Sequence, residues 1–116
     1  MLMAQIVYKI VSQAHWAGFE ATGVFSGATI DLVDGYIHLS TGRQVRETAA
    51  KHFAGQNDLI LVAVAGDKLG DALKFEVSRG NDLFPHFYGQ LQLKHVLWSK
   101  PLVLDVFGKH VFPEIL

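Results

Sequence analysis

The sequence predicts a compact α+β domain, in which two short helices in the N-terminal half pack on a mostly antiparallel, split β-sheet. Two helical patterns precede residue 55, and the rest of the chain consists of short β-rich segments bounded by glycine and proline. Such separate runs of helices and strands favour an α+β fold over a doubly wound one. The 116 residues are half hydrophobic, which suffices for a buried core in a single domain over 1–116.

The N-terminal part is predicted to form a strand over 6–10 and then a helix over about 13–22. Ser12 precedes the helix and is a typical N-cap residue, because its hydroxyl can accept a hydrogen bond from a free backbone N–H of the first turn. Gly23 is a typical residue at a helix end. The following segment, 24–33, fits neither the helical nor the strand period and stays ambiguous.

A turn at 34–35 separates this segment from a second strand and a second helix. Polarity alternates over 36–40, which indicates a strand. Thr41 and Gln44 have the spacing of a capping box. Apolar residues then recur every four positions, so we expect a helix from about 42 to 54 with one buried face.

The second half reads mainly as strands. The continuous apolar run 59–64 predicts a strand that is buried on both faces. Further strands are expected over 73–78 and 91–99, and a final hairpin over 103–112. The aromatic segment 84–89 contains proline and glycine and is too broken for a regular strand, so we expect an ordered loop there.

Composition excludes several functions. The chain has no cysteine, which removes disulfides, thiolate metal sites and cysteine nucleophiles. Its net charge of −1 argues against broad nucleic-acid binding. The longest apolar run, 59–65, is far below the roughly 18 residues that span a bilayer, and the first ten residues lack a basic leader. We therefore expect a cytoplasmic protein without a membrane partner, as a monomer or a weak homo-oligomer.

The first candidate site centres on His38, within the segment 35–41. Both neighbours of His38 are apolar, so its side chain faces solvent or a cleft if they face the core. A predicted helix begins just afterwards, and the free N–H groups at a helix N-terminus suit an anion such as a phosphate. Ser40, Thr41 and Arg43 would add donors. The alternative is a half-exposed strand histidine followed by an ordinary helix cap.

The second candidate site is the aromatic segment 84–89. Pro85 restricts the residue before it, and Gly89 permits a sharp exit, so the segment is expected to be rigid. It would present His86 and Tyr88 to a flat ligand, by stacking and by proton transfer. The alternative is that its phenylalanines only plug the end of the core.

The third candidate is Glu76, which shares a strand face with Lys74. Its carboxylate would act as a base or bind a ribose hydroxyl, and the alternative is an exposed strand residue. His38, Glu76 and His86 together have the donor types of a two-histidine, one-carboxylate metal site. They lack the short spacing of metal motifs, so we expect no metal.

These motifs resemble, in order and over nearly the whole chain, a small bacterial family, the domain-of-unknown-function family numbered 952. The combination of His-Leu-Ser-Thr with Phe-Pro-His-Phe-Tyr-Gly is specific. The segments that carry the resemblance are Ile6–Ile10, Trp16, Asp34–Thr41, Gln44–Val45, Phe75–Glu76 and Leu83–Leu91.

The family is in turn similar, more remotely, to the ADP-ribosyltransferase superfold, with RNA 2′-phosphotransferases as its proposed nearest relatives. This likeness implies a cleft between two small sheets that holds NAD. It implies that His38 is the second polar position of the cleft, with Ser40 as the small hydroxyl that follows. Lys9 takes the first position, where the family usually has histidine, and the third lies near Glu76 or the segment 84–89.

Three functions follow as hypotheses. The first is a domain that binds NAD or a related small nucleotide and transfers an ADP-ribosyl or phosphoryl-type group from it. The second is a non-catalytic binding module, since Lys9 replaces histidine, and the third is a protein-interaction domain that uses the aromatic segment. Under the first, the catalytic residues are His38, His86 and Glu76, and the ligand-binding residues are Lys9, Ser40, Thr41, Arg43 and Tyr88.

Overall fold

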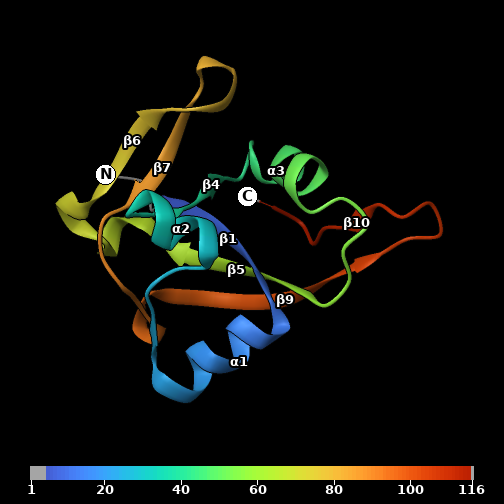
Figure 1. The fold of residues 1–116 in the computed structure, drawn as a ribbon, viewed down its shortest axis with the longest axis horizontal. Helices are drawn as coiled ribbons and strands as arrows, with labels where there is room; N and C mark the ends of the chain where they lie inside the picture. The colour runs from blue at the N-terminus through green and yellow to red at the C-terminus, as the bar shows by residue number, and fades with distance from the viewer. Residues whose placement is uncertain (1–4, 116) are drawn as a thin grey trace.

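The computed structural model describes residues 5–115, which form antiparallel sheets flanked by three α-helices (Figure 1). The largest sheet has the strand order β10-β9-β5-β1-β4. A second sheet has the order β3-β7-β6, and β2 pairs with β8. All these pairings are antiparallel, so the predicted α+β class with a split sheet is confirmed.

The elements have the following bounds. The helices are α1 (Gln13–Thr22), α2 (Thr29–Asp34) and α3 (Val45–His52). The strands are β1 (Ile6–Ser12), β2 (Val24–Phe25), β3 (Ile37–His38), β4 (Ser40–Thr41), β5 (Leu59–Ala65), β6 (Leu73–Val77), β7 (Leu83–Phe87), β8 (Leu91–Gln92), β9 (Val96–Leu104) and β10 (His110–Val111). Residues 1–4 and 116 of the predicted domain lie outside the described residues. Residues 1–4 also belong to the N-terminal stretch that was considered for a leader.

The first helix forms as its sequence predicts. The Ser12 hydroxyl accepts a hydrogen bond from the backbone N–H of His15 at 3.0 Å, and Gly23 ends the helix in the left-handed conformation at φ +79°. Helix α3 is shorter than expected, because the Gln44 side chain turns back to accept from Thr41 N and donates to the carbonyl of Leu83. Gln44 thus ties the start of α3 to β7.

Two local predictions are wrong. Among the described residues, the N-terminal half holds three helices rather than two, because the ambiguous segment contains α2. Most of the aromatic segment is the strand β7 rather than a loop, since it pairs with β3 on one side and with β6 on the other. Four of the five residues of β7 are buried, so both of its faces carry bulky residues and the usual polar alternation is absent.

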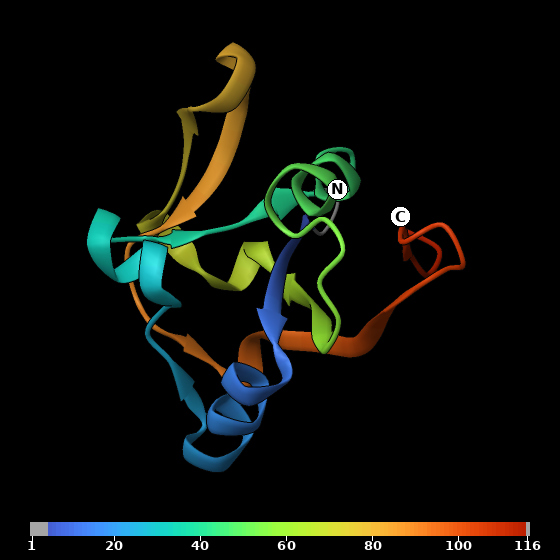
Figure 2. The same cartoon turned by 45° about the vertical axis from the view of Figure 1, so that its right-hand side comes forward.

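The core lies on both faces of β5, whose seven residues are all buried, as predicted. One face contacts α1 and the β3–β7 region, and the other contacts α3 and β9. In both views the β6–β7 hairpin projects from one side of the molecule, whereas α1 lies on the opposite side (Figures 1 and 2). Over residues 5–115, no helix combines the length and apolarity that a membrane crossing requires.

Candidate functional site

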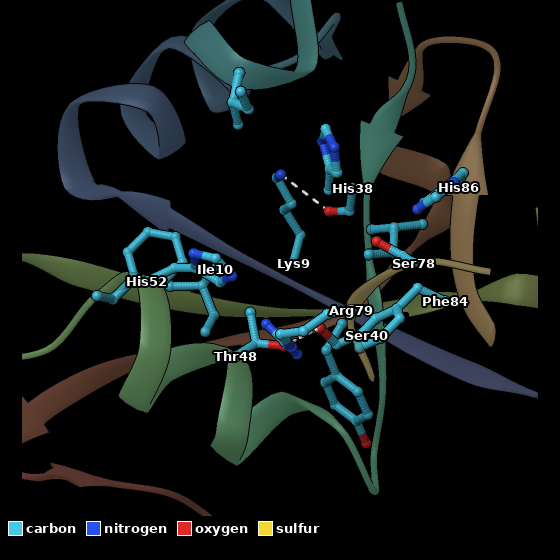
Figure 3. Close-up of a pocket in the computed structure, with 14 residues that line it drawn as sticks. Lys9, Ile10, His38, Ser40, Thr48, His52, Ser78, Arg79, Phe84 and His86 are labelled. Carbon is cyan, nitrogen blue, oxygen red and sulfur yellow. Dashed lines mark hydrogen bonds between the residues drawn. The ribbon is translucent and has the colours of Figure 1, made fainter. Parts of the chain in front are cut away.

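A cavity of about 620 Å³ lies where the two larger sheets meet (Figure 3). The segment 37–41 passes from one sheet to the other, because β3 pairs with β7 whereas β4 pairs with β1. This volume is in the range of small-molecule sites. The lining residues are Tyr8, Lys9, Ile10, Ile30, His38, Leu39, Ser40, Thr48, His52, Phe53, Ser78, Arg79, Phe84 and His86.

The lining of this cavity carries basic and imidazole side chains but no carboxylate. Its lining includes a lysine, an arginine and three histidines, and neither aspartate nor glutamate. Four hydroxyl side chains, one of them that of Tyr8, and a set of apolar and aromatic side chains complete the walls. A lining of this type suits a ligand that combines negative charge with an apolar or aromatic part.

Lys9 belongs to a buried ionic cluster at one side of the cavity. Its ammonium lies 2.9 Å from Asp31 Oδ2 and donates to the backbone carbonyl of His38 at 3.0 Å. Asp31 also accepts hydrogen bonds from the backbone N–H groups of Ala28, at 2.8 Å, and His38, at 3.0 Å. The carboxylate therefore joins α2, β1 and β3, and it positions Lys9 within the lining.

The protonation of this cluster follows from its contacts. Burial raises the pKa of Asp31, but the hydrogen bond from His38 and the charge of Lys9 outweigh that effect and hold the pKa well below its usual range. Burial lowers the pKa of Lys9, and the carboxylate of Asp31 opposes this shift. We infer an ion pair rather than a neutral pair.

Sequence reasoning missed Asp31. Its segment lacks a clear period, and the residue is too far along the chain from Lys9 for any spacing rule to connect them. The one available signal was an acidic residue among apolar neighbours, Ile30, Leu32 and Val33.

Gly27 makes room for this cluster, and its replacement is expected to disturb it. Gly27 has φ +129°, and an added Cβ would lie 2.7 Å from the Cβ of Asp31. We expect Gly27→Ala to cost about 1–3 kcal/mol of folding stability, measured by denaturant unfolding. Gly18→Ala is the matched control, because Gly18 lies within α1 with nothing within 4 Å, and should be neutral or stabilising. Equal effects of both substitutions would contradict this account.

The ring of His38 is held between two carboxylates. Its Nδ1 lies 2.6 Å from Asp31 Oδ1, and its Nε2 lies 2.9 Å from Asp34 Oδ2. The neighbours Ile37 and Leu39 are buried, as the alternation predicts, and His38 lines the cavity. Because a carboxylate only accepts hydrogen bonds, this geometry suits a ring that donates from both nitrogens.

A second polar group forms around His86, whose ring neighbours that of His38. His86 Nδ1 lies 2.9 Å from Glu76 Oε1, and the Tyr88 hydroxyl donates to the same oxygen at 2.7 Å. The ring of Tyr36 stacks on that of His86, with centroids 4.1 Å apart. Hydrogen bonds from Tyr88 and His86 lower the pKa of Glu76, so its carboxylate is ionised at neutral pH.

The pKa of the Tyr88 hydroxyl is expected to lie well above that of an ordinary tyrosine. The hydrogen bond to Glu76, together with burial and the nearby negative charge, raises its pKa to about 12. In Glu76→Gln the charge is lost, and the midpoint should fall toward the ordinary value near 10. NMR titration of ring-labelled tyrosine measures both midpoints, and an unchanged Tyr88 midpoint would contradict the assigned contact.

Arg79 forms the third polar group with two hydroxyls. The Ser40 and Thr48 hydroxyls lie 2.8 Å apart, and Arg79 Nη2 donates to Thr48 Oγ1 at 3.1 Å. The guanidinium also lies over the ring of Phe84, 4.7 Å from its centroid. Its Nε is buried, has no hydrogen-bond partner among the described residues, and lies 3.7 Å from the carboxylate of Glu47. Figure 3 shows Arg79, Thr48 and Ser40 together at one end of the cavity.

The structure brings only some of the predicted site residues together. Four of them line the cavity: Lys9, His38, Ser40 and His86. Glu76 stands behind His86 and holds its ring.

Three further predicted residues, Thr41, Arg43 and Tyr88, lie outside the lining. The Arg43 side chain is 84% exposed and faces Asp82 at 3.7 Å. The sequence does not identify Arg79 as a site residue, because its loop, 79–82, has no distinctive feature besides a glycine.

The fold and this cavity define a small α+β protein with a pocket at the junction of two sheets. The chain belongs to the family DUF952, described as proteins of unknown function, whose model matches residues 10–99. The resemblance expected from the motifs is thereby confirmed for this family.

Solved structures support the same assignment. The crystal structure of protein CC0527 from Caulobacter crescentus is 47% identical, covers 91% of this chain and 93% of its own, and superposes with a TM-score of 0.88. The solution NMR structure of CC0527 is 48% identical, covers 90% of each chain, and gives a TM-score of 0.81. A search of curated proteins gives no match.

Proposed function

We propose that the cavity binds an anionic nucleotide, such as NAD or another ADP-ribose-bearing molecule. The observation that supports this proposal is the charge character of the lining, which has five basic or imidazole side chains and no carboxylate. Phosphates supply the negative charge that such a lining favours, and a base and ribose supply the flat and hydroxylated parts.

Arg79 is the natural partner for a phosphate. It is always charged, it is preoriented by Phe84 and Thr48, and its Nε has an unused donor. The hydroxyls of Ser40 and Thr48 lie beside it. Lys9 contributes less, because the carboxylate of Asp31 already neutralises its charge.

A cavity at the junction of two sheets is the arrangement that the expected similarity to the ADP-ribosyltransferase superfold implies. We therefore retain group transfer from the bound nucleotide as part of the proposal. The interaction-domain alternative has less support, because Phe84, His86 and Phe87 are buried in β7 and Tyr88 is the one exposed aromatic residue of the segment 84–89.

An NMR titration of the full chain tests this function. AMP, ADP-ribose and NAD should shift the resonances of Ser40, Arg79 and His86, and the shifts should weaken as salt is raised. Adenosine is the matched control, because it has the base and ribose without the phosphate, and its effect should be much smaller. The absence of shifts at these residues with all three nucleotides at millimolar concentration would refute the proposal.

A further inference from the structure

Two of the three histidines that line the cavity, His38 and His86, are neighbours but differ in their hydrogen-bond partners. His38 and His86 are register partners in the β3–β7 pair, and their ring centroids are 5.6 Å apart. Both line the cavity. Only a histidine nitrogen that carries a lone pair can accept a proton. The hydrogen-bond partners of the two nitrogens in each of these rings therefore decide which of the two rings can accept one.

Both ring nitrogens of His38 face a carboxylate. Asp31 faces its Nδ1 and Asp34 faces its Nε2, both within 3 Å. A lone pair on either nitrogen would point at a carboxylate oxygen, which has no hydrogen to offer. His38 is therefore placed as a donor between carboxylates.

His86 is arranged differently. The oxygen 2.9 Å from its Nδ1 belongs to the ionised carboxylate of Glu76, so in the neutral ring Nδ1 carries the hydrogen and Nε2 carries the lone pair. The ring is 4% exposed and is stacked on Tyr36, and Nε2 has no hydrogen-bond partner within residues 5–115. Tyr88 holds the same Glu76 oxygen, which restrains the carboxylate.

We propose that, of these two histidines, His86 is the proton acceptor, through Nε2, toward a hydroxyl of the bound ligand or of water. Glu76 is its positioning residue, and His38 takes no part in accepting protons. The hydroxyl would donate its hydrogen to Nε2, and the carboxylate of Glu76 would stabilise the resulting imidazolium. The ligand class rests on the proposed function above, whereas the tautomer and the free lone pair of His86 do not.

Nitrogen-15 NMR of the imidazole rings tests the assignment in the free protein. The neutral ring of His86 should show a hydrogen on Nδ1 and none on Nε2, whereas both nitrogens of His38 should show hydrogens that face the carboxylates of Asp31 and Asp34. Glu76→Gln should shift His86 toward a mixture of tautomers, because the amide offers both a donor and an acceptor. The opposite tautomer at His86, or a bare Nε2 at His38, would overturn the proposal.

Acylation by diethyl pyrocarbonate provides a chemical readout, since the reagent attacks a nitrogen that has a lone pair. Peptide mass spectrometry should find His86 modified several times faster than His38, with exposed His15 as the reference. AMP should slow the modification of His86 and leave His15 unchanged.

The two proposals fail in different ways. If AMP binds by NMR without protecting His86, the proton-acceptor role is wrong while nucleotide binding stands. If AMP does not bind, the proposed function fails, and the tautomer of His86 still decides the assignment. A hydrogen on Nε2 and none on Nδ1 of His86 would refute it in either case.

Discussion

Replacement of Asp31 by alanine is expected to lower the free energy of unfolding by about 3–5 kcal/mol, because it leaves the ammonium group of Lys9 buried without its partner. The side chain of Asp31 is fully buried and that of Lys9 is 8% exposed, so water cannot take over the lost contact. The substitution also removes the acceptor of the Ala28 and His38 backbone N–H groups. Urea unfolding measures the change.

Asp34→Asn is the matched control for this substitution. Asp34 is on the same helix and also faces His38, but its side chain is 38% exposed and its only salt bridge among the described residues is to that ring. Its loss should cost less than about 1 kcal/mol. The double substitution Asp31→Ala with Lys9→Met should be less destabilised than Asp31→Ala alone, because no buried charge remains. Equal losses for Asp31→Ala and Asp34→Asn would contradict this account of the cluster.

The same carboxylate predicts a dependence of stability on pH. Its pKa lies below its usual range in the folded state and near 3.9 in the unfolded chain, so the unfolded chain binds more protons between the two values. The stabilisation is therefore complete above about pH 4 and is lost as the pH falls toward the folded-state pKa. Unfolding free energies measured from neutral pH down to about pH 3 should fall more steeply in the natural chain than in Asp31→Asn.

Local patterns were sufficient for the elements that depend on their own residues. The cap at Ser12, the end at Gly23 and the apolar run of β5 each report a nearest-neighbour preference or a buried environment, and all three form as predicted. These features establish the α+β class. They do not reveal how the two sheets meet, because that junction depends on β3 and β4, which have two residues each.

The elements that sequence reasoning missed are those held by distant partners. Helix α2 has six residues and is stabilised by contacts of Asp31 with β1 and β3 rather than by its own propensity. Strand β7 is buried on both faces, so it lacks the alternation that marks a half-exposed strand.

The candidate site shows the same division. The motifs around His38 and His86 were visible, because unusual residues cluster there in the sequence. The partners of the ring nitrogens are Asp31 and Asp34 at His38 and Glu76 at His86. Only the fold brings Asp31 to His38 and Glu76 to His86.

The structure favours Arg79 as the phosphate-binding residue, whereas the sequence favours Arg43, and substitutions of the two arginines distinguish these predictions. Arg79→Gln is expected to weaken AMP binding roughly ten- to a hundredfold, since a charge-assisted hydrogen bond contributes about 1.5–3 kcal/mol and each 1.4 kcal/mol is about tenfold in affinity. Arg79→Lys should give an intermediate loss, because it keeps the charge but not the planar fork that lies over Phe84. Calorimetric titration with AMP measures the affinities, and thermal unfolding checks that each variant folds.

Arg43→Gln is the control with the same chemical change at the position that the sequence favoured. Arg43 lies beside the start of α3, but its side chain is 84% exposed and outside the lining, so the affinity for AMP should change less than about twofold. A loss at Arg43 that equals or exceeds the loss at Arg79 would move the phosphate to the helix N-terminus and out of the cavity. A loss confined to Arg79 would place the phosphate beside Ser40 and Thr48, at the end of the cavity where the arginine already has its position fixed by Thr48 and Phe84.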